Sequence, residues 1–250
     1  MTEPHALVPV HAPKLALGRI GSAAQDDIDE TLHVLREMQQ DVNAPARIRA
    51  YRPAPTVAFS RRESLMPEFT AAAAAARDLG FDPVIRLAGG RAVAYDETCL
   101  IVDLIAPVEL YNNHIAAFDT SAGCVRDVLR DLGVDARVGP VVGEYCAGDH
   151  SVNARGAVKV VGIAQRVSRR VRLITACIVL DAPERLRPVV TAVYAAMTLD
   201  WVPATLGSVR DEGVPGTPDE IAHALVVGLQ QEHSAWAVPQ VAQTPGTAID

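Results

Sequence analysis

Residues 151–181 hold three β-rich runs with very short connections, and they constrain the fold of this chain more than any other stretch. SVNAR leads into KVVGIAQRV through a turn around Gly156, and RVRLITACIVLD follows at 170–181. Strands joined by tight turns are antiparallel, because a parallel pair needs a crossover connection of about a dozen residues or more. The stretch therefore predicts an antiparallel hairpin followed by a further strand.

The other segments alternate between strand-like and helical patterns. Strands are expected over 47–52, 55–60 and 134–138, and over 82–107 as a strand, a glycine turn and a long strand. Helices are expected from Asp26 to Met38, over 68–80 with Gly80 as the cap, over 113–133, over 183–198 with a break at Pro188, and from a capping box at 217–220. Hairpin-paired strands with helices inserted between them indicate an α+β fold with a mainly antiparallel sheet flanked by helices.

The length of 250 residues suits one large domain, and no internal repeat or linker divides it. We expect this domain to occupy residues 21–235. The segments 1–20 and 236–250 are rich in Pro, Ala, Thr and Gln without periodicity, so flexible tails are expected there.

Charge and hydropathy exclude several classes of function. The net charge is −7 and no Lys/Arg-rich run stands out, so nucleic acid is not an expected partner, although a local basic patch could bind an acidic carrier protein. No window approaches the roughly 20 apolar residues of a membrane span, and Glu3 with two prolines makes the N-terminus unlike a signal peptide. The four cysteines are Cys99, Cys124, Cys146 and Cys177, and they form no C-x-x-C pair. We therefore expect a cytoplasmic protein in which these cysteines are free thiols.

Lys159 is unusual in this chain. Of the 23 basic residues only Lys14 and Lys159 are lysines, and Lys159 lies inside the apolar run AVKVVG. A lysine in a strand is often an edge residue whose ammonium reaches solvent. Because arginine meets nearly every other need for positive charge here, the position indicates that a compact ammonium is required.

Cys146 lies in the glycine-containing loop EYCAGDH, thirteen residues before Lys159. A lone cysteine is most often a small buried hydrophobe, and Cys99 and Cys177, within apolar β-rich runs, fit that role better. A thiol near an ammonium also fits covalent acyl transfer, in which the thiolate is the nucleophile. His150 could be a general base, but no second ligand pair completes a zinc site with Cys146, so no metal is expected.

The stretch RLAGGRAVAYDE, residues 86–97, contains a glycine pair between two strands. Such a pair is most often only a turn. It also allows the backbone to approach a ligand closely, because Gly89 and Gly90 carry no Cβ, and Arg86 would place positive charge beside the ligand.

In order and spacing, these motifs resemble the lipoate-protein ligase and octanoyltransferase family over about residues 24–230. The anchors are PTVAFSRRE (55–63), VIRLAGGRAVAYDE (84–97), the Tyr145-Cys146-Ala147-Gly148 loop and VKVVGIAQR (158–166). The chain departs from the family pattern at Ile85, Arg91 and Ser151, and Ser151 stands where an acidic residue is common. The resemblance implies the catalytic fold that the family shares with biotin-protein ligases, which is class II synthetase-like.

The resemblance implies that the protein is an acyltransferase. It would hold an octanoyl or lipoyl group as a thioester on Cys146, stabilised by Lys159, and pass the group to a lysine of a carrier domain. The alternatives are an ATP-dependent lipoate-protein ligase, in which Cys146 is incidental, and a non-catalytic member that only binds lipoyl domains or acyl groups. The transferase needs no cofactor, whereas the ligase needs ATP and Mg. Implied partners are lipoyl carrier domains (the glycine cleavage H protein or E2 subunits) and acyl carrier protein. Implied substrate-binding residues are Arg86, Gly89, Gly90, Arg91, Ala92, Tyr95, Gly148 and Gly162.

Overall fold

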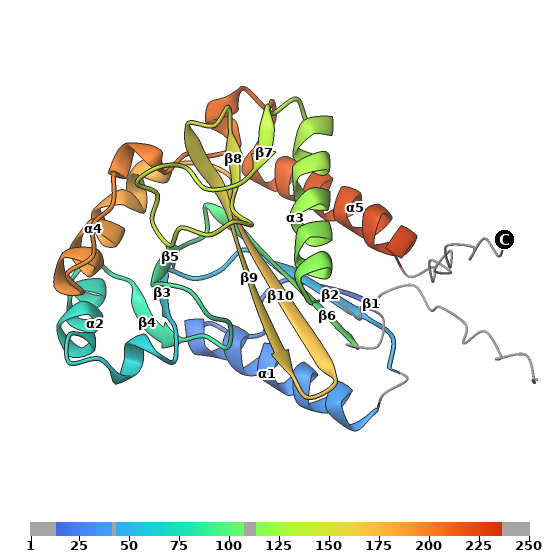
Figure 1. Ribbon diagram of the computed structural model, residues 1–250, viewed down its shortest axis with the longest axis horizontal. Helices are drawn as coiled ribbons and strands as arrows, with labels where there is room; N and C mark the ends of the chain where they lie inside the picture. The colour runs from blue at the N-terminus through green and yellow to red at the C-terminus, as the bar shows by residue number, and fades with distance from the viewer. Residues whose placement is uncertain (1–13, 42–43, 108–113, 237–250) are drawn as a thin grey trace, which may run out of the picture.

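The computed structural model of the chain describes residues 14–41, 44–107 and 114–236 (Figure 1). Most of the two expected tails, residues 1–13 and 237–250, lie outside this range. The described end of the expected N-terminal tail contains a short strand, β1 (Lys14–Leu17). None of the described helices is long and apolar enough to cross a membrane.

A seven-stranded sheet forms the centre of the molecule (Figure 1). In spatial order its strands are β1, β2 (Arg47–Tyr51), β6 (Cys99–Pro107), β10 (Val171–Val179), β9 (Val158–Ser168), β8 (Val152–Ala154) and β7 (Ala136–Val138). All neighbours are antiparallel except β1 and β2, which are parallel. The expectation of a mainly antiparallel sheet, with the hairpin at Gly156, is confirmed.

A second, three-stranded sheet lies beside the first in the order β4 (Asp82–Ile85), β3 (Thr56–Phe59) and β5 (Val93–Tyr95). The expectation of one long strand at the end of 82–107 is wrong, because this stretch is divided between the two sheets. The backbone N–H and the hydroxyl of Thr98 both donate to Asp96 Oδ1, which makes a turn between β5 and β6. The turn falls on the polar residues Asp96, Glu97 and Thr98, between two apolar segments that belong to different sheets.

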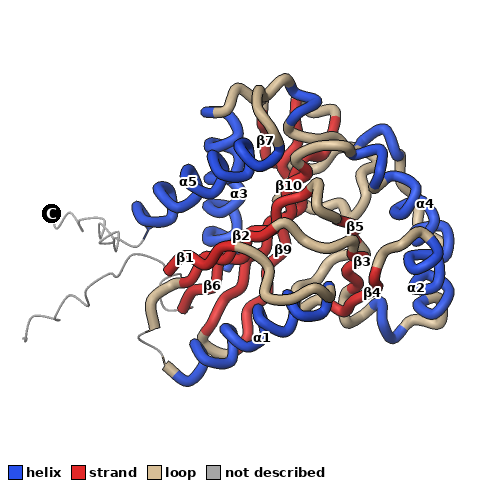
Figure 2. The backbone as a smooth tube through the Cα atoms, turned by 180° about the vertical axis from the view of Figure 1, so that it is seen from behind, coloured by secondary structure: helices blue, strands red, loops and turns tan. Residues whose placement is uncertain are grey.

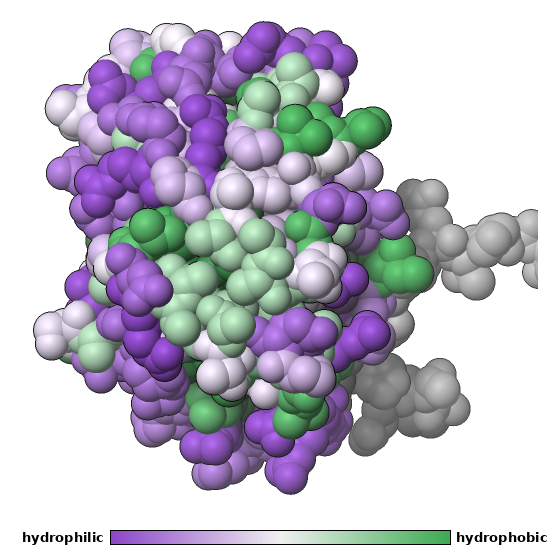
Figure 3. All heavy atoms as spheres, turned by 90° about the vertical axis from the view of Figure 1, so that its left-hand side faces the viewer, coloured by the Kyte–Doolittle hydropathy of each residue, from purple (hydrophilic) through white to green (hydrophobic). Residues whose placement is uncertain are grey.

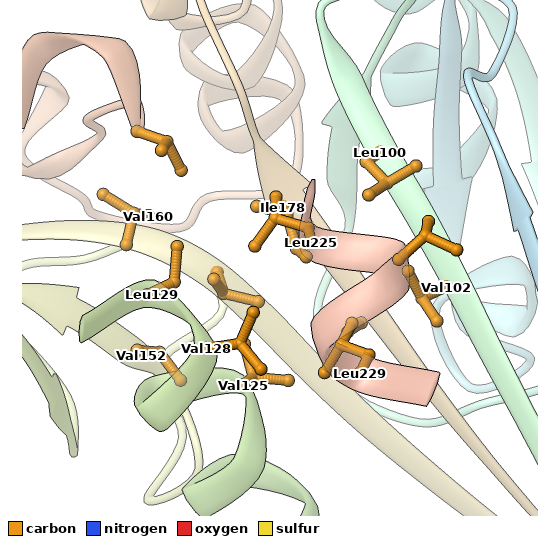
Figure 4. Close-up of a cluster of buried hydrophobic side chains, with 14 of the residues drawn as sticks. Leu100, Val102, Val125, Val128, Leu129, Val152, Val160, Ile178, Leu225 and Leu229 are labelled. Carbon is orange, nitrogen blue, oxygen red and sulfur yellow. The ribbon is translucent and has the colours of Figure 1, made fainter. Parts of the chain in front are cut away.

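Helices cover both faces of the large sheet (Figures 1 and 2). α3 (His114–Asp131) and α5 (Pro218–Trp236) pack on one face, and their apolar side chains meet those of the strands in one buried cluster (Figure 4). On the other face, Val34, Leu35 and Met38 of α1 (Ala24–Gln40) pack against β6 and β10.

The remaining helices, α2 (Phe69–Asp78) and α4 (Arg187–Ala196), pack on the small sheet. Their outer side is weakly apolar at its centre and hydrophilic around it (Figure 3). α2 ends before Gly80, whose φ is +80°, as expected for a helix cap. The stretch 183–198 is divided, as expected, into a short 3₁₀ helix (Pro183–Arg185) and α4, and Pro188 lies just after the break. It occupies the first turn of α4, where its missing N–H costs no hydrogen bond.

Strand register decides which side chains share the inner face of the large sheet. Cys177 of β10 pairs with Ile101 on one side and Gly162 on the other, and Thr175 pairs with Asp103 and Ala164. Side chains alternate between the faces of a strand, so these two rows point the same way, toward α1 and the small sheet.

Candidate active site

A cavity of about 280 Å³ opens on this inner face. Its walls come from β6, β9 and β10, from the glycine loop between β4 and β5, and from the loop that contains Cys146. Eight of the residues that the sequence singled out line it: Arg86, Gly89, Gly90, Tyr95, Cys146, Gly148, Lys159 and Gly162. Arg91 and Ala92 are not among the lining residues. They take part in the site through their backbone N–H groups, which donate to Cys146 and Glu63 respectively.

The glycine loop is folded around Arg86. The guanidinium donates to the carbonyl oxygens of Gly89, at 2.7 Å, and Arg91, at 2.8 Å. Gly90 has φ +98°, and a Cβ there would lie 3.0 Å from the sulfur of Cys146 and 2.8 Å from an Arg86 nitrogen. Glycine is therefore required at this position both by the backbone conformation and by the approach of the sulfur. This tight loop turns the backbone N–H of Arg91 toward Cys146 Sγ, at 3.2 Å.

Two further side chains fix this loop from outside. Glu63, buried next to Ser60, accepts the N–H of Ala92 at 2.8 Å. Arg166 of β9 donates to the carbonyl of Leu87 at 2.9 Å. Both belong to stretches that carry the family resemblance, SRRE and GIAQR, but an acidic residue after a strand gives no sign in the sequence that it will bind a loop some thirty residues away.

Cys146 is half-buried and has a left-handed backbone, with φ 44°. Its N–H donates to the hydroxyl of Tyr194 at 2.7 Å, and that hydroxyl lies 3.3 Å from the carbonyl of Ala92, to which it donates. Burial raises the pKa of Tyr194, so its hydroxyl keeps the proton needed for the second bond. Tyr194 thereby joins the cysteine loop to the glycine loop, a role that no sequence pattern indicated.

Lys159 is 1% exposed, so the interpretation of an edge lysine that reaches solvent is wrong. Its ammonium donates to Glu144 Oε1 at 3.1 Å and to the carbonyls of Tyr145 at 3.0 Å and Cys146 at 2.8 Å. It also lies 4.7 Å from the centre of the Tyr145 ring. The ammonium and the cysteine loop thus form one unit.

The other cysteines are buried, as expected for Cys99 and Cys177, and Cys177 also lines the cavity. A hydrogen bond that the Cys99 thiol donates to Cys177, together with burial, raises the pKa of Cys99. Burial raises the pKa of Cys124 to about 12. The thiols of Cys99 and Cys124 therefore stay protonated and poorly nucleophilic, whereas Cys146 opens on the cavity.

His150, which the sequence left open as a general base, contacts two residues of α3. Its Nε2 lies 2.8 Å from Asp119 Oδ1, and its ring stacks on Phe118 with centroids 3.8 Å apart. Phe118 lines the cavity, whereas His150 is not among the lining residues. Within the described ranges, no group of three or more His, Cys, Asp or Glu residues could hold a metal ion.

The cavity also contains a buried acid that the sequence did not mark as functional, Asp103. Its two carboxyl oxygens lie 2.8 Å and 2.6 Å from the hydroxyls of Thr31 and Thr175. Burial raises its pKa, against the smaller opposite effects of these hydrogen bonds and of Arg49. A raised pKa favours the uncharged form of this carboxyl, and that form suits a wall that faces an apolar ligand. The sequence signal was the single acidic residue in CLIVDLIAP.

Taken together, the geometry can support acyl transfer. An accessible thiol faces a backbone N–H donor, a buried ammonium is bonded to its peptide, and an apolar cavity beside it can take a hydrocarbon chain. A cysteine at such a cavity can act as the nucleophile that carries an acyl group as a thioester.

Comparisons with known proteins give relatives of two kinds, curated sequences and solved structures. Several curated relatives carry the name octanoyl-GcvH:protein N-octanoyltransferase. The relative from an Exiguobacterium species is 28% identical over 121 residues, which are 48% of this chain and 43% of that protein. The relative from Oceanobacillus iheyensis is 27% identical over 139 residues, 56% of this chain and 48% of that protein. The chain therefore spans about half the length of the curated relatives it matches.

Solved structures share the fold at low identity. A structure from an archaeal lipoylation system, the bipartite lipoate protein ligase and its E2 lipoyl domain from Thermoplasma acidophilum, has a TM-score of 0.63 at 19% identity, covering 88% of this chain and 84% of that one. A lipoate-protein ligase A bound with ATP has a TM-score of 0.65 at 19% identity, covering 89% and 86%. The α+β fold expected from the sequence is confirmed. The model of the lipoyl protein ligase A/B catalytic domain matches residues 27–229, most of the chain, and the chain belongs to this family.

Proposed function

We propose that this protein is an acyltransferase of lipoate metabolism that carries an octanoyl or lipoyl group as a thioester on Cys146 and delivers it to a lysine of a lipoyl carrier domain. The observation that carries the proposal is the sulfur of Cys146, which lies at an apolar cavity and 3.2 Å from the backbone N–H of Arg91. The names of the curated relatives support the same activity.

Two steps complete the reaction. The Cys146 thiolate attacks the acyl carbonyl of the donor, the C–S bond forms, and the bond to the donor carrier breaks as its leaving group takes a proton. The amine of the acceptor lysine then attacks the thioester, an amide forms, and the thiol of Cys146 is restored. Val93, Ile101 and Leu173 would enclose the hydrocarbon chain during both steps.

The donor and acceptor partners are proposed from the relatives. A glycine cleavage H protein is the donor named for the curated relatives, and an E2 lipoyl domain accompanies the Thermoplasma ligase. Carrier domains of these kinds, and acyl carrier protein, are the partners to test. The four cysteines are free thiols, which suits the cytoplasm proposed for this protein.

An ATP-dependent ligase is the second candidate, since a ligase bound with ATP shares the fold. In it Lys159 would contact the acyl-adenylate and Cys146 would have no role. The residues of this chain favour the transferase. The Arg86 guanidinium donates to two carbonyl oxygens of its own loop, and the Arg91 N–H donates to the sulfur of Cys146, so neither group is free to bind a nucleotide phosphate in this conformation.

Intact-mass measurement separates the candidates. The wild-type protein incubated with an octanoyl-loaded carrier should gain one octanoyl group that maps to Cys146, and Cys146→Ser should neither gain it nor transfer it. Full transfer by Cys146→Ser given ATP, Mg and free octanoate would instead establish the ligase. Tight carrier binding without an adduct or transfer in either assay would indicate a non-catalytic binding protein. Lys159→Ala should abolish both enzymatic activities.

A further inference from the structure

We propose that Glu144 is a positioning residue for the nucleophile: its buried ion pair with Lys159 holds the Cys146 peptide in the left-handed conformation that directs the sulfur at the Arg91 N–H. The inference deepens the proposed function and rests on Cys146 being the nucleophile. Nothing in the sequence pattern distinguished Glu144 from other acidic loop residues.

The first observation is how the ammonium of Lys159 is used. A lysine ammonium has three N–H donors. Lys159 has three acceptors within 3.1 Å, and they belong to three consecutive residues, Glu144, Tyr145 and Cys146. In this conformation the ammonium is therefore fully bonded to the cysteine loop. To hold an acyl carbonyl oxygen, as the resemblance implied, it would first have to release one of these contacts.

The second observation is that Glu144 joins the two ends of the loop. Its side chain is 0% exposed. One oxygen accepts the N–H of Val141 at 2.8 Å, and the other accepts the hydroxyl of Ser151 at 2.6 Å in addition to Lys159. Ser151 stands where the family often has an acidic residue, and here it donates to an acid supplied from the other end of the loop.

The third observation is the backbone of Cys146. A left-handed conformation at a residue with a Cβ is unfavourable and persists only where surrounding contacts determine it. Both polar backbone groups of Cys146 are bonded, the N–H to Tyr194 at 2.7 Å and the carbonyl to Lys159 at 2.8 Å. The carbonyl bond depends on the direction of the Lys159 ammonium, and Glu144 is its one charged partner among the residues described.

The chemical consequence is a division of roles. The Arg91 N–H contacts the sulfur directly, while Lys159 and Glu144 act on it through the peptide of Cys146. Neutralising Glu144 leaves the Lys159 ammonium buried without a counter-charge, so the ammonium should seek other acceptors and the loop should lose its fixed conformation.

The test compares Glu144→Gln, which keeps the size and one acceptor but removes the charge, with Glu144→Asp and with the control Glu212→Gln. The Glu212 side chain is only 6% exposed and also forms an ion pair, but its partner is Arg155 at the surface. We expect Glu144→Gln to lower the kcat of octanoyl transfer 10-fold to 100-fold with KM for the donor changed less than threefold. Glu144→Asp should recover part of that loss, and Glu212→Gln should stay within twofold of wild type.

A second measurement needs no acyl substrate. Amide hydrogen exchange in a peptide spanning residues 139–151 should be at least threefold faster in Glu144→Gln, with exchange in β9 and β10 unchanged. Wild-type exchange in this peptide, or a kcat within twofold of wild type, would overturn the positioning role. Absence of an octanoyl adduct on the wild-type protein would contradict the proposed function alone, because the exchange comparison would still report on the loop. If Glu144→Gln does not fold, the same two measurements on Glu144→Asp decide, with smaller changes in the same direction expected.

Discussion

At the scale of single residues, Gly90 shows how little space surrounds the sulfur of Cys146. We predict that Gly90→Ala lowers the rate of octanoyl addition to Cys146 at least 100-fold. The left-handed backbone costs a residue with a Cβ about 1–2 kcal/mol, and the new methyl group would lie 3.0 Å from the sulfur. Gly89→Ala is the matched control, since a Cβ there has no atom within 4 Å. Time-resolved intact mass measures both, and an unchanged rate in Gly90→Ala would refute this geometry.

The buried pair of Lys159 and Glu144 gives a prediction about stability that is independent of acyl chemistry. Lys159→Met should reduce the free energy of unfolding by about 3–5 kcal/mol, because it leaves the Glu144 carboxylate buried without its cation. Adding Glu144→Gln should recover more than half of that loss. Urea unfolding followed by circular dichroism measures the cycle. Additive losses in the double variant would show that the two side chains do not depend on each other.

Single residues also show where sequence reasoning succeeds. Lys159 and Cys146 could be predicted because each stands out from its surroundings, a lone lysine in an apolar strand and a cysteine in a glycine-containing loop. Glu63, Glu144 and Tyr194 could not, since their partners lie in other segments. What they do is set by the three-dimensional contact of loops that the sequence does not place together.

At the scale of elements, the strand β6 carries an acid into the cavity, and this has a consequence for pH dependence. The raised pKa of Asp103 means that the folded protein keeps a proton that the unfolded chain releases near pH 4. The contribution of Asp103 to stability is thus complete below that pH and is lost as pH rises toward the folded pKa. The loss amounts to about 1.4 kcal/mol for each pH unit that separates the folded from the unfolded pKa.

Asp103→Asn should therefore be more stable than wild type at pH 8, and the difference should vanish below about pH 4. Asparagine can repeat the pattern of a protonated carboxyl, accepting from Thr175 and donating to Thr31, whose own hydroxyl lies 3.1 Å from the Asp27 carbonyl. Thermal unfolding across pH measures the effect. A variant that is less stable than wild type at pH 8 would indicate that Asp103 is ionised in the folded protein.

Helices with one clear apolar face could be predicted from the local sequence pattern. α1, α2, α3 and α5 lie where their apolar faces and end signals placed them, and the capping box at Thr217 and Glu220 is formed in both directions. The split between β5 and β6 was missed, although the polar residues Asp96, Glu97 and Thr98 lie between the two strands. Both strands are apolar and buried, and only their sheet membership distinguishes them.

At the scale of the whole molecule, the site exists where the inner face of the large sheet meets the glycine loop of the small sheet and the cysteine loop. Periodicity could predict the sheets and helices but not this junction, because no local pattern records how two sheets are placed against each other. The family motifs predicted which residues belong to the site, but not that these residues lie close together in space. Their convergence on one cavity is a property of the folded molecule.

This placement predicts that the acyl chain stabilises the whole molecule. A chain on Cys146 is covalent, so it is exposed to water in the unfolded protein and enclosed by both sheets in the folded one. An octanoyl group has six more methylenes than an acetyl group, an upper limit of about 5 kcal/mol at 0.8 kcal/mol each. We expect the octanoyl form to melt at least about 5 °C above the acetyl form, given roughly 2–4 °C per kcal/mol for a protein of this size. Scanning calorimetry of the two thioesters measures it, with Cys146→Ser treated identically as the control. Equal melting temperatures for the two forms would mean that the chain does not enter the cavity.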